Sequence, residues 1–196
     1  MEETNSVKAF KYKLKDVVKE TDNKYILTMR SVYLDKNLAE LSNMYYKLLD
    51  NIKREKTNGD YNKVFELSML CIPLLEPLIF YNKKEYGSFS ILDIPPLEEA
   101  LTYLPATGAV GQINNIRDLI VINKELKPWK ENLDLAYEEL KARDIVLKVL
   151  KEKGAFIQSE LNNTSEIDVG GILYTMDRLN IVKREKSGRS YLVSLA

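Results

Sequence analysis

The sequence predicts a mainly α protein that becomes α+β only through one hairpin close to its C-terminus. Apolar residues recur at helical spacing in most segments, most clearly within residues 37–56, which indicates amphipathic helices. Near the C-terminus, residues 181–194 change to a strand, a polar tip at 186–189 and a second strand, which is typical of a β-hairpin. With 45% hydrophobic and 30% charged residues, the composition is that of a folded globular protein.

Residues 6–34 leave two interpretations open. Phe10, Tyr12 and Leu14 alternate as in a strand, whereas other apolar residues of the segment repeat as in a helix. A hairpin and a helix pair are therefore both possible. The helical pattern of the residues that follow favours the helix pair.

Two longer helices are expected next. In residues 37–56, Asn37 can cap the N-terminus, and the apolar residues form one face. The segment 61–75 is apolar nearly all round, so we expect this helix at the centre of the core. Pro73 and Pro77 should kink or end it, because proline lacks the amide hydrogen that a helix interior requires.

Three shorter helices are predicted in the middle of the chain, at residues 96–103, 111–122 and 127–140. Two prolines followed by acidic residues mark the start of the first one. The stretch Gly108-Ala109-Val110-Gly111 precedes the second one but lacks the lysine and hydroxyl residue of a P-loop. We therefore interpret it as a tight turn and not as a phosphate site.

The last 55 residues have a distinct order of elements. A helix is expected at residues 144–153, a very short helical pattern at 156–161, and a third helix from about residue 166 or 168 to 179. Asn180 stands where such a helix stops, and asparagine tolerates the left-handed conformation that often ends helices. The hairpin follows.

Three stretches carry a resemblance to a known class: Gln158-Ser159-Glu160-Leu161, then Met176-Asp177-Arg178-Leu179-Asn180-Ile181-Val182-Lys183-Arg184, then Gly188-Arg189-Ser190-Tyr191-Leu192-Val193. Residues 142–196 resemble the winged helix-turn-helix of bacterial and archaeal MarR-like and ArsR-like regulators. That resemblance implies that the third helix enters the major groove of DNA and that the hairpin is the wing. Residues 1–126 would then form a helical domain for dimerisation or partner binding, with residues 127–141 as a connector helix.

The resemblance also implies which residues contact DNA. We expect them to be Tyr174, Thr175, Arg178, Lys183, Arg184, Lys186 and Arg189. The basic residues of the wing could neutralise phosphates. The third helix departs from the usual pattern: Glu166 and Asp168 near its start would repel phosphates or complement the helix dipole. Gly170 and Gly171 weaken the helix by roughly 1 kcal/mol each, or admit close approach of a partner.

The charge distribution gives weak support to this interpretation. The formal net charge is zero. Residues 141–196 nevertheless carry ten basic and seven acidic residues, and the rest of the chain carries 19 basic and 22 acidic ones. A mildly basic segment joined to a mildly acidic one suits a nucleic-acid reader attached to a partner-binding domain.

Composition also excludes several kinds of chemistry. There is no histidine, which removes His-based catalysis and His-ligated zinc. The single cysteine, Cys71, cannot form an internal disulfide, and this fits a reducing cytoplasm. The polar, acidic start is unlike a signal peptide, and the apolar stretch 67–81 is too short and too interrupted to span a bilayer. We expect no metal, no cofactor and no membrane contact.

We therefore expect a cytoplasmic, non-catalytic DNA-binding transcriptional regulator and no enzyme activity. It would act as a homodimer, because one such module buries too little surface for strong specificity. The exposed apolar residues of helices 37–56 and 128–140 are the candidates for the dimer contact. The alternative is a protein-interaction scaffold whose winged helix binds protein, which the acidic third helix and the zero net charge favour.

Overall fold

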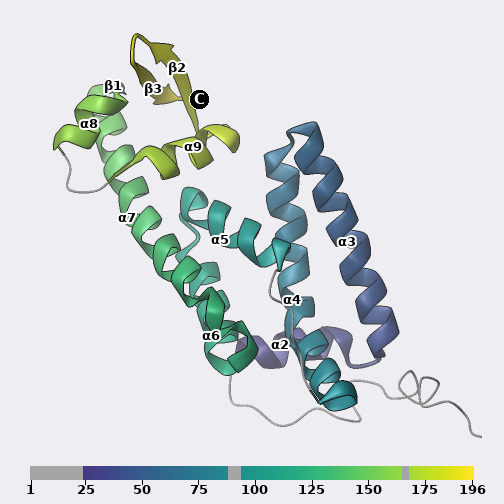
Figure 1. Ribbon diagram of the computed structural model, residues 1–196. Coiled ribbons are helices and arrows are strands. Elements are labelled where there is room, and N and C mark those ends of the chain that lie inside the picture. The colour runs from purple at the N-terminus through teal and green to yellow at the C-terminus, as the bar shows by residue number, and fades with distance from the viewer. Residues whose placement is uncertain (1–23, 88–93, 165–167) are drawn as a thin grey trace, which may run out of the picture. The chain divides into compact units, whose positions relative to one another are not determined.

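The computed structural model describes residues 24–87, 94–164 and 168–196 (Figure 1). These residues form helices and one small sheet close to the C-terminus, which confirms the predicted mainly α class with a C-terminal hairpin. In chain order, the helices and strands are α2 (Lys24–Tyr33), α3 (Leu38–Asn58), α4 (Tyr61–Tyr86), α5 (Pro95–Thr107), α6 (Val110–Ile122), the 3₁₀-helix η2 (Lys124–Trp129), α7 (Lys130–Lys153), β1 (Ala155–Ile157), α8 (Gln158–Thr164), α9 (Gly170–Arg178), β2 (Val182–Ser187) and β3 (Ser190–Leu195).

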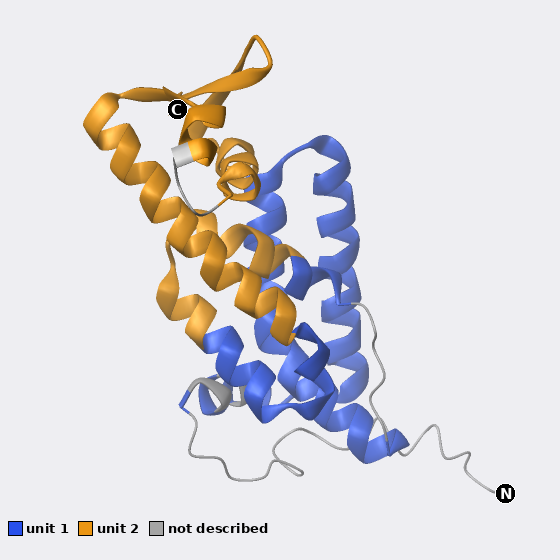
Figure 2. Cartoon of the chain, turned by 60° about the vertical axis from the view of Figure 1, so that its left-hand side comes forward, with its two compact units in different colours: residues 1–98, 115–129 blue, residues 99–114, 130–196 orange. Residues whose placement is uncertain are grey.

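The chain divides into two compact units, coloured separately in Figure 2. Unit 1 comprises residues 1–98 and 115–129, and unit 2 comprises residues 99–114 and 130–196. The division differs from the boundaries expected at 126 and 142. Most of α5 and the first turn of α6 belong with the C-terminal unit, because the α5–α6 turn packs against α7.

In unit 1, the start of α3 follows the local sequence closely. The side chain of Asn37 accepts a hydrogen bond from the Glu40 amide at 3.0 Å, and the Glu40 carboxylate accepts one from the Asn37 amide at 2.8 Å. This reciprocal capping box satisfies two amides that the first helical turn leaves unpaired. The predicted cap and helix are therefore confirmed. Of the ambiguous segment 6–34, residues 24–33 are helical and residues 6–23 lie outside the described residues.

Helix α4 is longer than the sequence suggested, because Pro73 and Pro77 lie inside it and do not end it. A proline in a helix interior costs about 3 kcal/mol. Fully burying a large apolar side chain stabilises the fold by about 1.5–3 kcal/mol. Leu74, Leu75 and Ile79 are all at most 2% exposed, so burial around the two prolines offsets their cost.

By length and composition alone, α4 could cross a membrane, contrary to the expectation for residues 67–81. Its most apolar window has a mean hydropathy of 1.7, and 67% of that window is buried inside the fold. A buried core helix gives the same values. No other helix in the described residues passes this test.

Helix α7 is continuous, and the expected break between a connector at 127–141 and a helix at 144–153 is absent. Residues 127–129 belong instead to η2. No glycine or proline interrupts residues 130–153. Leu133, Ala136, Ala142, Val146 and Leu150 are buried along its whole length, so burial sustains one uninterrupted helix.

The sheet of unit 2 has three strands and not two. Residues 155–157, the start of the predicted helical pattern 156–161, form β1, and α8 begins at Gln158. Phe156 lies opposite Val193 of β3, and both are buried. The strand order is β1-β3-β2, antiparallel throughout. Pairing with β3, which is distant in sequence, therefore decides the conformation of these three residues.

Helix α9 packs its apolar side inward and ends as predicted. Ile172, Leu173 and Met176 are completely buried. Asn180 has a φ of 55°, the left-handed conformation expected of it. Below, the segment from Val182 to Leu195 is called the wing hairpin.

Candidate nucleic-acid interface

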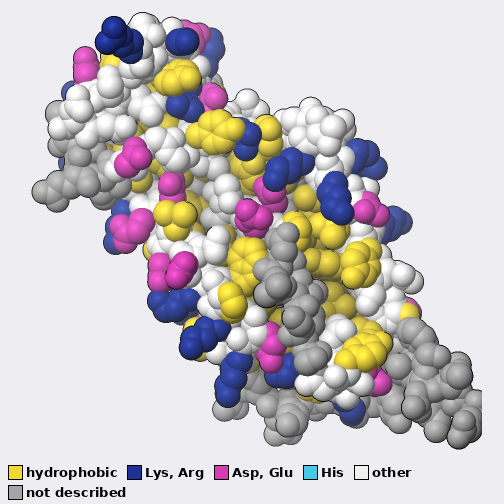
Figure 3. Space-filling view, viewed as in Figure 1, with side chains coloured by type: hydrophobic (Ala, Val, Ile, Leu, Met, Phe, Trp, Pro, Cys, Tyr) yellow, Lys and Arg dark blue, Asp and Glu magenta, His cyan; other side chains and the backbone are white. Residues whose placement is uncertain are grey.

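The seven residues predicted to contact DNA lie on α9 and the wing hairpin of unit 2. In Figure 3, yellow apolar and dark blue basic side chains lie next to each other over these elements. The seven residues have different surroundings, however. Some are exposed as expected, and others are buried or bonded to residues within the fold.

Tyr174 and Arg178 form a stacked pair on the outward side of α9. They are four residues apart, so they lie one above the other on the helix surface. The Arg178 Cζ is 4.1 Å from the centre of the Tyr174 ring, which is a cation–π contact. Arg178 Nη1 also donates a hydrogen bond of 3.5 Å to the Tyr103 hydroxyl of α5. The guanidinium is therefore held from two sides, while 49% of Tyr174 remains exposed.

Thr175 does not lie on the outward face, and this part of the prediction was wrong. It is only 6% exposed, and its hydroxyl donates a hydrogen bond of 2.8 Å to the Gly171 carbonyl. The physical reason is its position between Ile172 and Met176, which both point into the core. A hydroxyl bound one turn back within its own helix cannot read a base edge.

Arg184 was expected to contact phosphate, but its side chain contacts α8 and β3 and its backbone contacts α9, all within unit 2. Its Nη2 donates a hydrogen bond of 3.0 Å to Gln158 Oε1 of α8. Its Cζ lies 4.3 Å from the centre of the Tyr191 ring of β3. Its backbone amide donates a hydrogen bond of 3.1 Å to the Asp177 carboxylate of α9. Arg184 is thus half-buried and structural as well as positive.

One nitrogen atom of Arg184, its Nε, is buried and lacks a hydrogen-bond partner among the described residues. A buried donor without a partner costs about 1–3 kcal/mol. The contacts with Gln158 and Tyr191 must offset this cost, which supports a role in holding the wing hairpin in place.

The remaining three basic residues are exposed at the wing hairpin. Lys183 Nζ forms an ion pair of 2.5 Å with Glu185, whose hydrogen bond and negative charge raise the pKa of Lys183. Lys186 lies opposite Tyr191 in the hairpin register, and Arg189 follows the turn glycine. Among the described residues, neither Lys186 nor Arg189 forms an ion pair. The wing hairpin therefore presents two cations to solvent, Lys186 and Arg189, and a third, Lys183, that is paired with Glu185.

The start of α9 is acidic. Asp168 is exposed, and its carboxylate accepts a hydrogen bond of 2.9 Å from the Gly170 amide. Glu139 of α7 reaches the backbone at Gly171, where a β-carbon would collide with its carboxylate oxygen. Partial burial and the nearby charge of Asp168 raise the pKa of Glu139. The space at Gly171 is therefore filled from within unit 2.

Glu166, the other acidic residue noted at this end of the helix, lies outside the described residues. Four residues that contact the predicted ones or the start of α9 were not among the predicted site residues: Tyr103, Glu139, Gln158 and Tyr191. Only Tyr191 left a signal in the sequence, because it faces Lys186 across a hairpin whose tip is basic. The other three are brought next to the predicted residues or to the start of α9 by contacts between distant segments.

Two observations concern thiol and metal chemistry in the described residues. Burial raises the pKa of the Cys71 thiol to about 12, so it is a poor nucleophile and a poor metal ligand. Within the described ranges, no group of three cysteine, aspartate or glutamate side chains gathers to hold a metal ion. Compared with known protein families, with curated proteins and with solved structures, the chain has no significant match.

Proposed function

We propose that this chain is a non-catalytic DNA-binding protein of the transcription-regulator class and that unit 2 supplies the contact surface. The observation that carries the proposal is a set of basic side chains on α9 and the wing hairpin, two elements that the hydrogen bond between Asp177 and Arg184 connects. Arg178 follows Asp177, Asp177 binds the backbone of Arg184, and Lys186 and Arg189 lie further along the wing hairpin. The order of helix, strand, two helices and hairpin is that of a winged helix.

In this proposal the exposed basic residues of the wing hairpin supply most of the affinity. Lys183, Lys186 and Arg189 would neutralise phosphates and release counterions, which makes binding strongly salt-dependent. Arg178 is the one basic side chain of α9 that could approach a base or the backbone. The protein would act by occupying its site, with no covalent chemistry.

The expected homodimer remains part of the proposal. Two modules on symmetric half-sites would supply the specificity that one module lacks. The exposed apolar residues on the two candidate helices are Met44 and Tyr46 of α3 and Leu135 of α7. Sedimentation equilibrium of the whole chain tests the dimer, and a monomer at all concentrations would contradict it.

The test is a salt titration of binding to a random-sequence duplex. The variant Lys183→Ala/Lys186→Ala/Arg189→Ala leaves Arg184 in place, because Arg184 holds the wing hairpin. The slope of log affinity against log salt should become shallower by about 2 to 3 in this variant. Absence of binding at low salt would refute the proposal.

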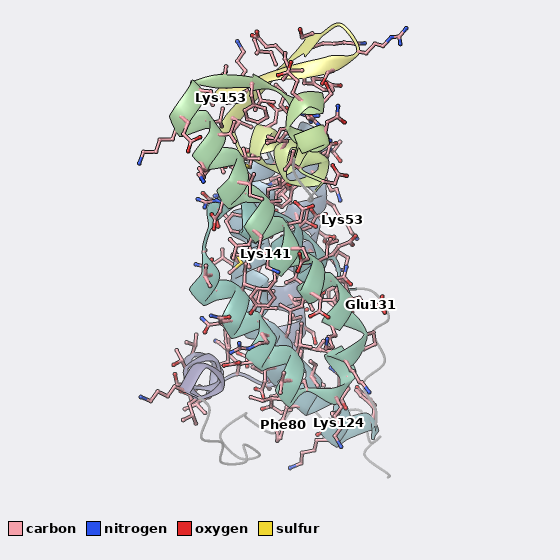
Figure 4. The ribbon with its side chains drawn as sticks, turned by 90° about the vertical axis from the view of Figure 1, so that its left-hand side faces the viewer. Lys53, Phe80, Lys124, Glu131, Lys141 and Lys153 are labelled. Atoms are coloured by element: carbon pink, nitrogen blue, oxygen red, sulfur yellow. The ribbon has the colours of Figure 1, made fainter. Side chains whose placement is uncertain are left out.

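A matched control removes three other lysines. Lys53, Lys124 and Lys141 are exposed, lie on α3, η2 and α7, and are labelled in Figure 4. The variant Lys53→Ala/Lys124→Ala/Lys141→Ala changes the net charge by the same amount. Its slope should match the wild type. An equal loss in both variants would mean that overall charge and not the wing hairpin governs binding.

A protein-interaction scaffold is the second candidate. The observation that favours it is the acidic start of α9, where Asp168 and Glu139 would repel a phosphate backbone. The burial of Thr175 also removes one group for base readout. A photoreactive residue at Tyr174 tests this candidate: a discrete protein adduct in cells supports it, and adducts to DNA alone contradict it.

A further inference from the structure

Two tyrosine–arginine stacks are the most unusual feature of this surface. Tyr174 carries Arg178 over its ring at 4.1 Å, and Tyr191 carries Arg184 at 4.3 Å. Both rings remain partly open, with 49% and 39% of the residue exposed. Each stack therefore combines a partly exposed tyrosine with a positive charge held over its ring.

The two stacks are joined through one residue. Asp177 precedes Arg178 in α9 and accepts a hydrogen bond of 3.1 Å from the backbone amide of Arg184. Tyr191 in turn lies opposite Lys186 in the hairpin register. The aromatic surfaces and the basic tip thus belong to one connected stretch of unit 2.

This chemistry suits unpaired bases better than a closed duplex. Within a duplex, the faces of the bases are already stacked, and only their edges are open to hydrogen-bond donors and acceptors. A tyrosine ring has one hydroxyl for an edge but a whole face for stacking. Unpaired bases stack on aromatic rings and on arginine planes regardless of sequence. The poor set of edge-reading groups on α9 agrees with this preference.

We propose that the DNA bound by unit 2 has unpaired bases beside its duplex part and that Tyr174 and Tyr191 stack on those bases. The proposal rests on the DNA-binding function proposed above and names the form of DNA that this surface takes. The basic tip would hold the adjoining phosphates. The guanidinium groups, held over the rings, would lie beside the bases and the backbone that follows them.

The test compares a blunt 20-base-pair duplex with the same duplex carrying a ten-nucleotide thymidine tail. Binding is followed by fluorescence anisotropy at one salt concentration. One stacked base adds about 5- to 150-fold in affinity, so the tailed duplex should bind at least fivefold more tightly. Tyr174→Leu and Tyr191→Leu should each reduce this preference, which is the ratio of the two affinities, by about fivefold or more.

Two kinds of control accompany these variants. Tyr174→Phe and Tyr191→Phe keep the ring and should keep the preference. Tyr86→Leu removes a tyrosine that is 67% exposed on α4, and it should leave the preference unchanged. A 2-aminopurine in the tail reports stacking in the wild type directly, so the test does not depend on the folding of a variant.

The outcomes separate the two proposals. A tailed duplex that binds no better than the blunt one, without a change in 2-aminopurine fluorescence, overturns the stacking proposal and leaves the DNA-binding function standing. Absence of binding to either probe at low salt overturns both. A preference for the tail that is lost in the leucine variants and kept in the phenylalanine variants supports the stacking proposal.

Discussion

Gly108 gives the sharpest test of how unit 2 is built. It lies between α5 and α6 with a φ of 73°, a conformation that glycine adopts freely and other residues rarely do. An added β-carbon would lie 2.6 Å from Cζ of Arg143 on α7. Arg143 Nε donates a hydrogen bond of 3.0 Å to the Ala106 carbonyl near the end of α5. Gly108→Ala should therefore strain the backbone and displace the arginine that caps α5.

The two effects can be estimated separately. A left-handed conformation costs a residue with a β-carbon about 1–2 kcal/mol. A hydrogen bond from a charged donor contributes about 1.5–3 kcal/mol. If the guanidinium moves far enough to lose its bond, Gly108→Ala should lower the free energy of unfolding by about 3 kcal/mol.

Urea unfolding of four proteins measures this: the wild type, Gly108→Ala, Arg143→Met and the double variant. In the Arg143→Met background the β-carbon meets no guanidinium, so Gly108→Ala should cost only the strain of about 1–2 kcal/mol. An equal cost in both backgrounds would refute the reasoning. It would also remove the argument for grouping the α5–α6 turn with α7.

Three further predictions concern single side chains. Because burial raises the pKa of Glu139, the stability that its protonated form contributes is fully present below the ordinary pKa and is lost as the pH rises through the raised pKa. Glu139→Gln should therefore raise the melting temperature at pH 7 and leave it unchanged near pH 3. Equal effects at the two pH values would contradict burial as the cause. Asn37→Ala should lower the free energy of unfolding by about 1 kcal/mol, measured in urea, while an unchanged midpoint would show that the capping box of Glu40 contributes nothing. Asn180→Ala should cost about 1 kcal/mol and Asn180→Gly almost nothing, because only the former worsens the strain at φ 55°; equal unfolding curves for the two would contradict this.

Helix ends were the most predictable part of the fold. Asn37 and Asn180 act on their own neighbours, so the capping box and the left-handed stop follow from residues within three or four positions. The tight turn at Gly108 was predictable for the same reason. Local hydrogen bonds and backbone preferences need no knowledge of the rest of the chain.

Elements that depend on distant contacts were not predictable. Residues 155–157 are extended because β3, almost forty residues later, pairs with them. Helix α4 continues through Pro73 and Pro77 because its surroundings bury the residues between and beyond them. Neither the partner strand nor the burial can be read from a local window, so propensity alone gave the wrong answer in both places.

The site shows the same limit at the level of single side chains. The sequence placed the basic residues on α9 and the wing hairpin, but it could not reveal which of them face a partner within the fold. Arg184 finds Gln158, which is 26 residues earlier, and Arg178 finds Tyr103, which is 75 residues earlier. A count of positive charges therefore overestimates how many of them a ligand can reach.

The exposed basic residues and the arginines fixed within the fold have different roles in the proposed interface. Lys183, Lys186 and Arg189 are exposed on flexible side chains, so they can follow any phosphate backbone and pay ordering entropy when they bind. Arg178 and Arg184 are already fixed on tyrosine rings, so little entropy remains to be lost and their geometry is preset. Salt-dependent affinity should therefore depend on the tip, and selectivity for the form of the DNA should depend on the two stacks. Variants at the tip and at the tyrosines should accordingly change different properties of binding, which is why the salt slope and the preference for a tailed duplex have to be measured separately.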